Sequence, residues 1–236
     1  MISSNTMKKE LCAASVKAIQ LAKKYNFDRI ELCQNLEQGG TTPSIGMIQF
    51  AVSSAVKTHV LIRQRSGDFI YSQDEIQVMI TDVKRFNLLG VKGVVVGSLT
   101  EKKEIDVVTI VKMLESVEGL EFTFHRAFDD IADWKKAMDL LIQLKFKRIL
   151  TSGGDSNVDE GFQKLKEIVQ YANGRIEIMA GGGINSQNIK KIISEIKPNA
   201  IHFSGTIVSK QTTSSLFSTD YLEVNEEIVK GILEQM

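Results

Sequence analysis

The sequence predicts an α/β protein that folds as a single-domain (β/α)₈ barrel, the TIM barrel, over residues 1–236. Three observations predict this fold. The length of 236 residues is close to the roughly 250 residues that are usual for it. Short apolar segments alternate with segments of helical pattern along the chain, and eight of the apolar segments can be counted. No linker of different composition interrupts the alternation.

The predicted strands are short, apolar and often β-branched, as strands buried on both faces of a parallel sheet should be. They are residues 10–13, 28–33, 59–63, 93–97, 121–125, 148–151, 176–180 and 200–203. An open doubly wound sheet produces the same local alternation and remains the alternative fold. The number of repeats favours the barrel.

The predicted helices lie between these strands, and several begin at a residue that caps helices well, namely Ser15, Ser44, Ser72, Asp133 and Asn185. The helices are residues 16–25, 44–55, 73–89, 106–117, 133–144, 158–171 and 185–196. The strand and helix repeats thus cover about residues 9–207. In the remainder, residues 208–220 are rich in Ser and Thr and predict a long loop, and residues 222–235 predict an amphipathic helix that closes the eighth repeat.

Composition excludes several classes of function. Lys plus Arg equal Asp plus Glu at 29 each, so no net field attracts nucleic acid or an acidic membrane surface. The N-terminus has no apolar core segment, and about 18 consecutive apolar residues occur nowhere, so we expect neither a signal peptide nor a membrane span. We therefore expect a cytoplasmic protein in which the two cysteines are free thiols.

Polar residues follow the predicted strands at the end where barrel enzymes carry their chemistry. Side chains alternate along a strand, so Glu31, Arg63 and His125 are expected to meet inside the barrel. An inward Glu31 beside Arg63 predicts an ion pair, either functional or purely structural. The candidate catalytic residues are Glu31, Arg63, His125, Arg126 and Asp129.

Each histidine has a functional and a structural interpretation. His125 is expected at the top of its strand, where Asp129 could tune it for proton transfer, although Asp129 could instead only cap the turn before the next helix. His59 is at the start of its strand and is expected to be structural. His202 either lines the pocket or is a hydrogen-bonded core residue.

Glycine and hydroxyl residues follow the last three strands. In phosphate-binding barrels, the loops after strands seven and eight hold the phosphate through backbone N–H groups. The alternative is that the glycines only make tight turns or allow close packing. The candidate ligand-binding residues are Ser152, Gly153, Gly154, Gly181, Gly182, Gly183, Ser204, Gly205 and Thr206.

Many of these motifs together resemble the CutC copper-homeostasis family. The resemblance runs from about residue 10 to residue 206 and rests on residues 10–12, 29–33, 39–44, 63–72, 124–129, 150–154, 179–183 and His202. It implies a TIM barrel, a cytoplasmic location, a role in handling copper and a homo-oligomer, which we take to be a dimer. The chain departs from the family pattern at Gln64, Ser66, Phe203 and Gly205.

The copper role can also be considered chemically. Cys12 and Cys33 end two neighbouring strands, and soft thiolates are good ligands for Cu(I). Free cysteines are also common buried apolar residues, so a structural role is the alternative. Two functions therefore stay open. One is a copper-binding protein that uses the two cysteines, helped by a histidine. The other is an enzyme for a small phosphorylated or otherwise anionic metabolite, with Glu31 or His125 as acid or base and Arg63, Arg65 and Arg126 holding the anion.

Overall fold

The computed structural model describes residues 7–209 and 220–236 and confirms the predicted barrel. Eight parallel strands form a closed sheet in the order of the sequence, β1 to β8. Pairing of Lys8–Ala13 with the last strand, with Lys8 opposite Ala200 and Leu11 opposite Phe203, closes the sheet and excludes an open doubly wound fold. The strands are β1 Lys8–Ala13, β2 Arg29–Leu32, β3 Thr58–Leu61, β4 Gly93–Val96, β5 Glu121–Phe124, β6 Arg148–Thr151, β7 Glu177–Gly181 and β8 Ala200–Phe203.

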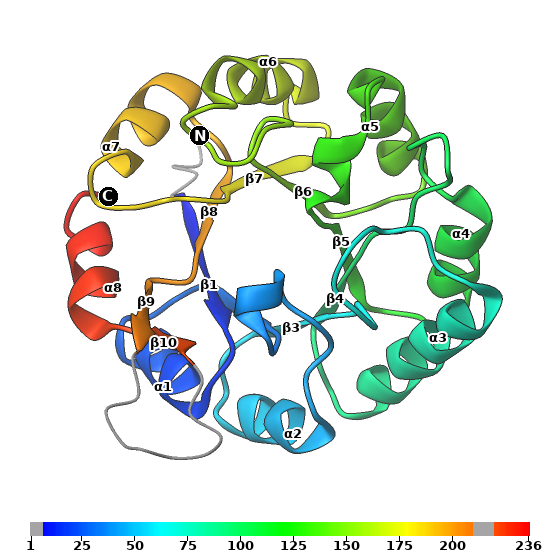
Figure 1. Cartoon of the computed structure of the whole chain (residues 1–236), viewed down its shortest axis with the longest axis horizontal. Helices are drawn as coiled ribbons and strands as arrows, with labels where there is room; N and C mark the ends of the chain where they lie inside the picture. Colours follow the sequence, from blue (N-terminus) through cyan, green and yellow to red (C-terminus); the bar gives the residue numbers. More distant parts are fainter. Residues whose placement is uncertain (1–6, 210–219) are drawn as a thin grey trace, which may run out of the picture.

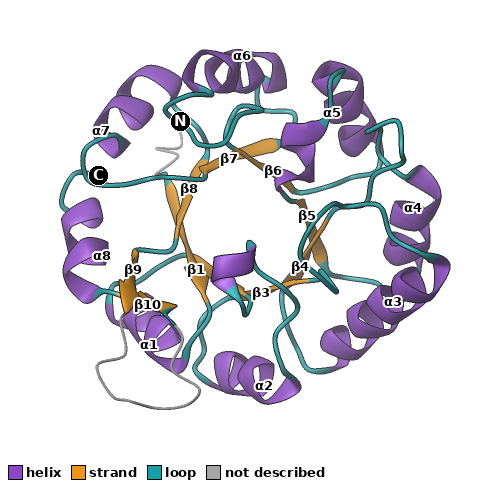
Figure 2. Ribbon diagram, viewed as in Figure 1, coloured by secondary structure: helices purple, strands orange, loops and turns teal. Residues whose placement is uncertain are grey.

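Helices form an outer ring around these strands (Figures 1 and 2). Their apolar faces pack on the outside of the sheet and make one continuous core. The α-helices are α1 Val16–Lys24, α2 Ile45–Ser53, α3 Gln73–Leu88, α4 Val107–Glu115, α5 Trp134–Gln143, α6 Phe162–Ala172, α7 Ile189–Lys191 and α8 Glu226–Leu233. Shorter helical turns are η1 Leu36–Gln38, η2 Arg126–Asp130 and η3 Ile192–Ile196, and the last of these continues α7 as a π-helix.

Most of the capping residues that the sequence predicts stand at the N-terminus of a helix. The side chains of Ser15, Ser44 and Asp133 each accept a hydrogen bond from a backbone N–H in the first turn. Ser72 makes a reciprocal capping box with Glu75 at the start of α3. These capping hydrogen bonds join residues that are neighbours in the sequence, so the helix starts can be predicted without knowledge of tertiary contacts.

Two helices begin later than predicted because an asparagine makes a turn first. The Oδ1 atom of Asn157 accepts hydrogen bonds from the N–H groups of Asp159 and Glu160, and α6 begins only at Phe162. Asn185 makes the same kind of turn and delays α7 to Ile189. Asparagine side chains favour such turns over the helix interior.

The C-terminal segment also differs from the prediction. Residues 221–224, expected mostly as helix, form strand β10 (Tyr221–Val224), which pairs antiparallel with β9 (Thr206–Ser209). The helix begins at Glu226 after an Asn225 cap. Of the predicted Ser/Thr-rich loop, residues 208 and 209 belong to β9, and residues 210–219 lie outside the described part of the chain. Helix α8 fills the place between α7 and α1 and completes the ring (Figure 1).

The inside of the barrel is packed with side chains. Inward residues from the upper parts of the strands form a small apolar cluster of Cys33, Leu61 and Val95, and a second cluster contains Leu150, Met179 and Ala200. Charged and polar side chains occupy many of the other inward positions, which is costly unless each is paired. How they are paired distinguishes the two ends of the barrel.

Candidate functional site

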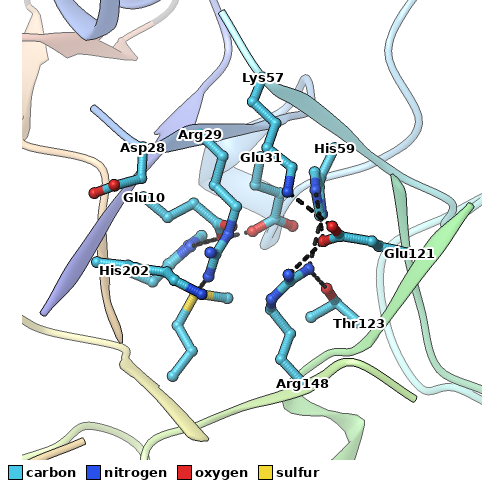
Figure 3. A network of polar contacts seen from close by, with 12 residues as sticks. Glu10, Asp28, Arg29, Glu31, Lys57, His59, Glu121, Thr123, Arg148 and His202 are labelled. Carbon is cyan, nitrogen blue, oxygen red and sulfur yellow. Dashed lines mark hydrogen bonds and ion pairs between the residues drawn. The ribbon is translucent and has the colours of Figure 1, made fainter. Parts of the chain in front are cut away.

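A network of ion pairs fills the end of the barrel where the strands begin (Figure 3). Its members, here called the lower network, come from the start of six strands and are Glu10, Arg29, His59, Glu121, Arg148 and Glu177. The two arginines are almost fully buried, and each contacts two carboxylates. The charges therefore compensate one another inside the barrel.

Arg148 is at the centre of one half of this network. Its guanidinium donates to Glu121 at 2.5 Å and to Glu177 at 3.1 Å, and it also donates to His59 Nδ1 and to the Thr123 hydroxyl. Burial would raise the pKa of Glu121, but its bonds to Arg148 and Lys57 lower the value to about 2. Burial and the Arg148 charge lower the pKa of His59 to about 3. His59 is thus a neutral structural residue, as expected from its position.

Arg29 forms the other half of the lower network. Its contacts lead through Glu10 and His202 towards the end of the barrel where the strands finish. It donates to Glu10 and, at 2.8 Å, to Glu177. Glu10 in turn contacts His202 Nδ1 at 2.7 Å. Burial would raise the pKa of Glu10, but the charges of Arg29 and His202 hold it well below the usual range. Glu10 is therefore an ionised carboxylate that orients the His202 ring.

His202 connects the lower network with the candidate site above it. Its Nε2 atom is 3.2 Å from Glu31 Oε2, so the ring lies between two carboxylates. Burial would lower the pKa of His202, but Glu31, Cys12 and Glu10 raise it well above its usual value. Burial raises the pKa of Glu31 to about 7; the His202 charge opposes this effect and the Glu10 charge adds to it.

The two cysteines lie side by side, as predicted, and next to this histidine. Cys12 Sγ and Cys33 Sγ are 3.7 Å apart and are free thiols. Ligand atoms of Cys12, Glu31 and His202 all lie within 4.8 Å of one another. The hydrogen bond with Cys33, together with burial, raises the pKa of the Cys12 thiol well above its usual value. The four side chains Cys12, Cys33, Glu31 and His202 are called the thiol centre below.

The thiol centre opens into a pocket of about 500 Å³, open solvent at its mouth included, at the end where the strands finish. Besides the thiol centre, the polar side chains in its lining are Arg63, His125 and Arg126. Glu31, Arg63 and His125, which the sequence analysis expected to meet inside the barrel, all line this pocket. Their partners differ from those predicted.

Arg63 does not pair with Glu31. Its guanidinium donates to three backbone carbonyls, those of Gln38 at 3.2 Å, Gly40 at 2.9 Å and Gly67 at 2.8 Å. These carbonyls come from the loops that follow β2 and β3, which fold over the arginine. The predicted ion pair between Glu31 and Arg63 is wrong because Arg63 donates its hydrogen bonds to the loop carbonyls, while Glu31 pairs with His202.

His125 is not tuned by Asp129. Its Nδ1 atom accepts a hydrogen bond of 3.0 Å from the N–H of Ala127, and burial together with the Arg63 charge lowers its pKa to about 3. The residue is neutral at physiological pH, so proton transfer near pH 7 by His125, which the sequence suggested, is not supported.

Asp129 is instead held by the loop after β6. Its carboxylate accepts hydrogen bonds from the N–H groups of Ser152 and Gly154, from the hydroxyls of Thr151 and Ser152, and from Arg126 Nε at 2.9 Å. Gly153 donates its N–H to the Thr151 hydroxyl. The loop of Ser152, Gly153 and Gly154 thus binds a carboxylate of the chain itself. Arg126 is paired with the same carboxylate.

The glycines at and after the end of β7 connect the loop after β7 with the loop after β6 through a backbone hydrogen bond. The Gly182 carbonyl accepts from the N–H of Val158, and the Gly183 carbonyl accepts from the side chains of Asn185 and Asn188. Gly182 and Gly183 have φ of +97° and +83°, where glycine is favoured, and Gly181 continues β7 beside them. After β8, the Ser204 and Thr206 hydroxyls bond each other at 3.0 Å on either side of Gly205. None of these six residues lines the pocket of the thiol centre, and anion binding by them stays a prediction.

Sequence reasoning missed Glu10 and Arg29 because both lie at the beginning of strands, where barrel residues are usually structural. A signal was present. Glu10 and Cys12 are two residues apart, as are Arg29 and Glu31, so strand alternation already places each pair on the same inward face.

A profile of the CutC family matches residues 7–207. The chain belongs to the CutC family. A family protein CutC of Glaesserella parasuis is 43% identical in an alignment of 238 positions that covers 97% of this chain and 98% of the relative. The human protein named copper homeostasis protein cutC homolog is 40% identical over 203 residues, covering 86% of this chain and 74% of the human one.

Solved structures agree with this assignment. The crystal structure of CutC from Streptococcus agalactiae matches with a TM-score of 0.80 and 37% identity, covering 84% of this chain and 99% of that one. A phosphoribosyl anthranilate isomerase from Thermotoga maritima matches with a TM-score of 0.60 but only 13% identity, which shows a shared barrel fold alone. No helix in the described part of this CutC-family chain has the length and apolar composition needed to cross a membrane.

Proposed function

We propose that this protein binds Cu(I) through Cys12 and Cys33, with His202 as a third ligand, and that it acts in copper homeostasis in the cytoplasm. The observation that carries the proposal is the pair of free thiols 3.7 Å apart at the mouth of the barrel. Two sulfurs at this separation can both reach one metal ion at the length of a metal–thiolate bond, about 2.3 Å for zinc. Thiolates select soft metal ions such as Cu(I). Membership of the CutC family supports the same role.

His202 has the surroundings of a metal-binding histidine. Its Nδ1 atom is bonded to the ionised carboxylate of Glu10, which leaves Nε2 directed to Glu31 beside Cys12. A histidine whose other ring nitrogen is held by a carboxylate is a common arrangement at metal sites, because the carboxylate fixes the ring and increases its basicity. Glu10 would therefore position the ligand and Glu31 would lie at the edge of the site.

Binding should tighten as the pH rises. The Cys12 thiol and the His202 ring carry protons in the free protein, since the pKa of each group is raised. A metal ion has to displace these protons, so each proton released makes the apparent affinity pH-dependent.

The test is the affinity for Cu(I), measured anaerobically by competition with a colorimetric chelator. Replacing both cysteines with serine should weaken binding by about a hundredfold or more, and His202→Asn by about tenfold or more. Met47→Leu removes a sulfur from the outer helix α2 and is the matched control, which should bind as the unchanged protein does. Equal affinity of the double-serine variant and the unchanged protein would remove the proposal.

A second candidate function is catalysis on a small anionic metabolite. It is favoured by the chain of contacts from Glu10 through His202 to Glu31, which ends in the pocket as a catalytic carboxyl group would. A thermal-shift screen of phosphorylated and carboxylated metabolites tests it, because a ligand of the folded state raises the melting temperature.

For either function we propose a homodimer, and sedimentation velocity would test this directly.

A further inference from the structure

Arg63 differs from the other two buried arginines of the barrel. Arg29 and Arg148 each contact two carboxylates. Arg63 is 6% exposed, and no acidic side chain in the described part of the chain lies within ion-pair distance of it. Its partners are the three backbone carbonyls described above. A buried positive charge that has no counter-ion is costly, so an external anion in the pocket would compensate it.

Unsatisfied hydrogen-bonding atoms gather around the same arginine. Four buried side-chain nitrogen or oxygen atoms have no partner in the described residues, and three of them belong to Arg63 (Nε), Tyr71 (the hydroxyl) and His125 (Nε2). The fourth, His59 Nε2, is at the opposite end of the barrel, 3.5 Å from Glu121. Leaving a buried donor without a partner is costly, so such atoms are usually satisfied by a ligand or by water.

His125 offers a neutral donor. Because its Nδ1 accepts the hydrogen bond from Ala127, the proton of the neutral ring is on Nε2, which is the unsatisfied atom. The low pKa of His125, about 3 through burial and the Arg63 charge, keeps the ring in this form. The site thus combines one fixed positive charge with one neutral N–H donor.

Phe69 packs against both donors. The Arg63 guanidinium lies 5.1 Å from the centroid of the Phe69 ring, and the His125 ring lies 4.7 Å from the same centroid. Gly97 makes room for the histidine, since a Cβ there would come within 2.3 Å of the His125 ring. The geometry is therefore built by packing rather than left to a mobile side chain.

We propose that this pocket binds the carboxylate of a small organic acid between Arg63 and His125, beside the thiol centre. Of the cations that line the pocket, Arg126 is paired with Asp129 and His202 with Glu10 and Glu31, so Arg63 alone has no carboxylate partner. Its single charge matches that of a carboxylate, whereas a doubly charged phosphate would meet the Glu31 carboxyl in the same pocket with one charge uncompensated. The inference gives the second candidate function its ligand class and holds whether or not copper binds.

The rest of the acid would extend over the thiols. The Gly40 carbonyl accepts from Arg63 at 2.9 Å, and a Cβ on the same residue would lie 3.8 Å from Cys33 Sγ. One residue therefore separates the proposed carboxylate subsite from the thiol centre. A ligand that carries a carboxylate and a metal-binding or reactive group a few bonds away fits both parts of the pocket.

The experiment uses acetate as the probe of the subsite alone. Acetate is titrated into the metal-free protein at constant ionic strength against sodium chloride, and the ¹⁵N–¹H signals of the arginine Nε–H and histidine Nε2–H groups are followed by NMR. We expect saturable shifts of the Arg63 and His125 signals with acetate and none with chloride. Arg63→Lys should weaken acetate binding about tenfold or more, because lysine keeps the charge but loses the planar fork of donors.

Controls separate this inference from the proposals above. Arg65, which the sequence analysis expected to help hold the anion, does not line the pocket and is paired instead with Glu75 and Asp68. Arg65→Lys should therefore leave acetate binding unchanged. The double-serine variant of the cysteines should lose Cu(I) and keep acetate. If Arg63→Lys does not fold, His125→Asn provides the second variant and should weaken acetate severalfold, because it removes the ring Nε2–H.

Three results would overturn the inference. They are the absence of a saturable shift at Arg63 and His125, an equal loss of affinity in Arg65→Lys, and binding of inorganic phosphate tenfold or more tighter than acetate, which would reassign the subsite to phosphate. None of them affects the copper test.

Discussion

The two ends of the barrel treat buried charge in opposite ways. At the end where the strands begin, Arg29 and Arg148 are surrounded by carboxylates, and the network is nearly complete (Figure 3). At the end where they finish, Arg63 is also buried but has only carbonyl partners, and donors around it are unsatisfied. A complete network stabilises the fold, whereas an incomplete one is what a ligand site requires.

The largest effect on stability is expected at the completed end. Arg148→Met would leave Glu121 and Glu177 short of a partner inside the barrel, so the free energy of unfolding should fall by about 3–5 kcal/mol. Chemical denaturation measures the change. Arg65→Met, which removes a surface arginine with two acidic partners, is the control and should cost less than about 1 kcal/mol. A loss of similar size in both variants would contradict the comparison.

An intermediate effect is expected from pH. Below pH 6.5 a histidine of the unfolded chain takes up a proton, while folded His125 stays neutral down to about pH 3. The unfolded state then binds more protons, so stability present above pH 6.5 is lost as the pH falls through this window. His125→Asn keeps an acceptor for the Ala127 N–H but cannot titrate. Between pH 6.5 and 4.5 the unchanged protein should lose about 2 kcal/mol more than this variant in urea titrations. Parallel pH profiles for the two proteins would count against a neutral His125.

The smallest effect on stability is expected from the arginine at the open end. Arg63→Met removes hydrogen bonds to three carbonyls but also removes a buried charge that has no counter-ion, and these two changes oppose each other. We expect a net change below about 1 kcal/mol in the free energy of unfolding, measured beside Arg148→Met. A cost as large as that of Arg148→Met would mean that Arg63 is structural and that the two ends do not differ.

Much of the candidate site could be predicted from the sequence because its positions follow from strand alternation. Glu31, Cys33, Arg63 and His125 are at or just beyond the ends of their strands on the inward face, and the structure places all of them around one pocket. Cys12 joins Cys33 because β1 and β2 are neighbours. Periodicity fixes which face a side chain occupies, and strand order fixes its neighbours.

The pairing of charges could not be predicted in the same way. Both Arg63 and His202 could have paired with Glu31. Because the loops after β2 and β3 fold over Arg63, its guanidinium bonds to backbone carbonyls, and Glu31 pairs with His202. In the same way, Asp129 turned out to be held by the loop after β6 rather than by His125. Such choices depend on side-chain contacts between residues far apart in the chain.

The sequence by itself determined the barrel, the order of its elements, the inward face of each strand and the meeting of the two thiols, because these follow from local periodicity, capping and strand order. Only the tertiary structure decided which buried charges are neutralised and which are not. Burial makes every unpaired charge or donor costly, and whether a partner is within about 3 Å is settled by packing, not by sequence spacing. That decision separates the structural arginines, Arg29 and Arg148, from Arg63 at the mouth of the barrel.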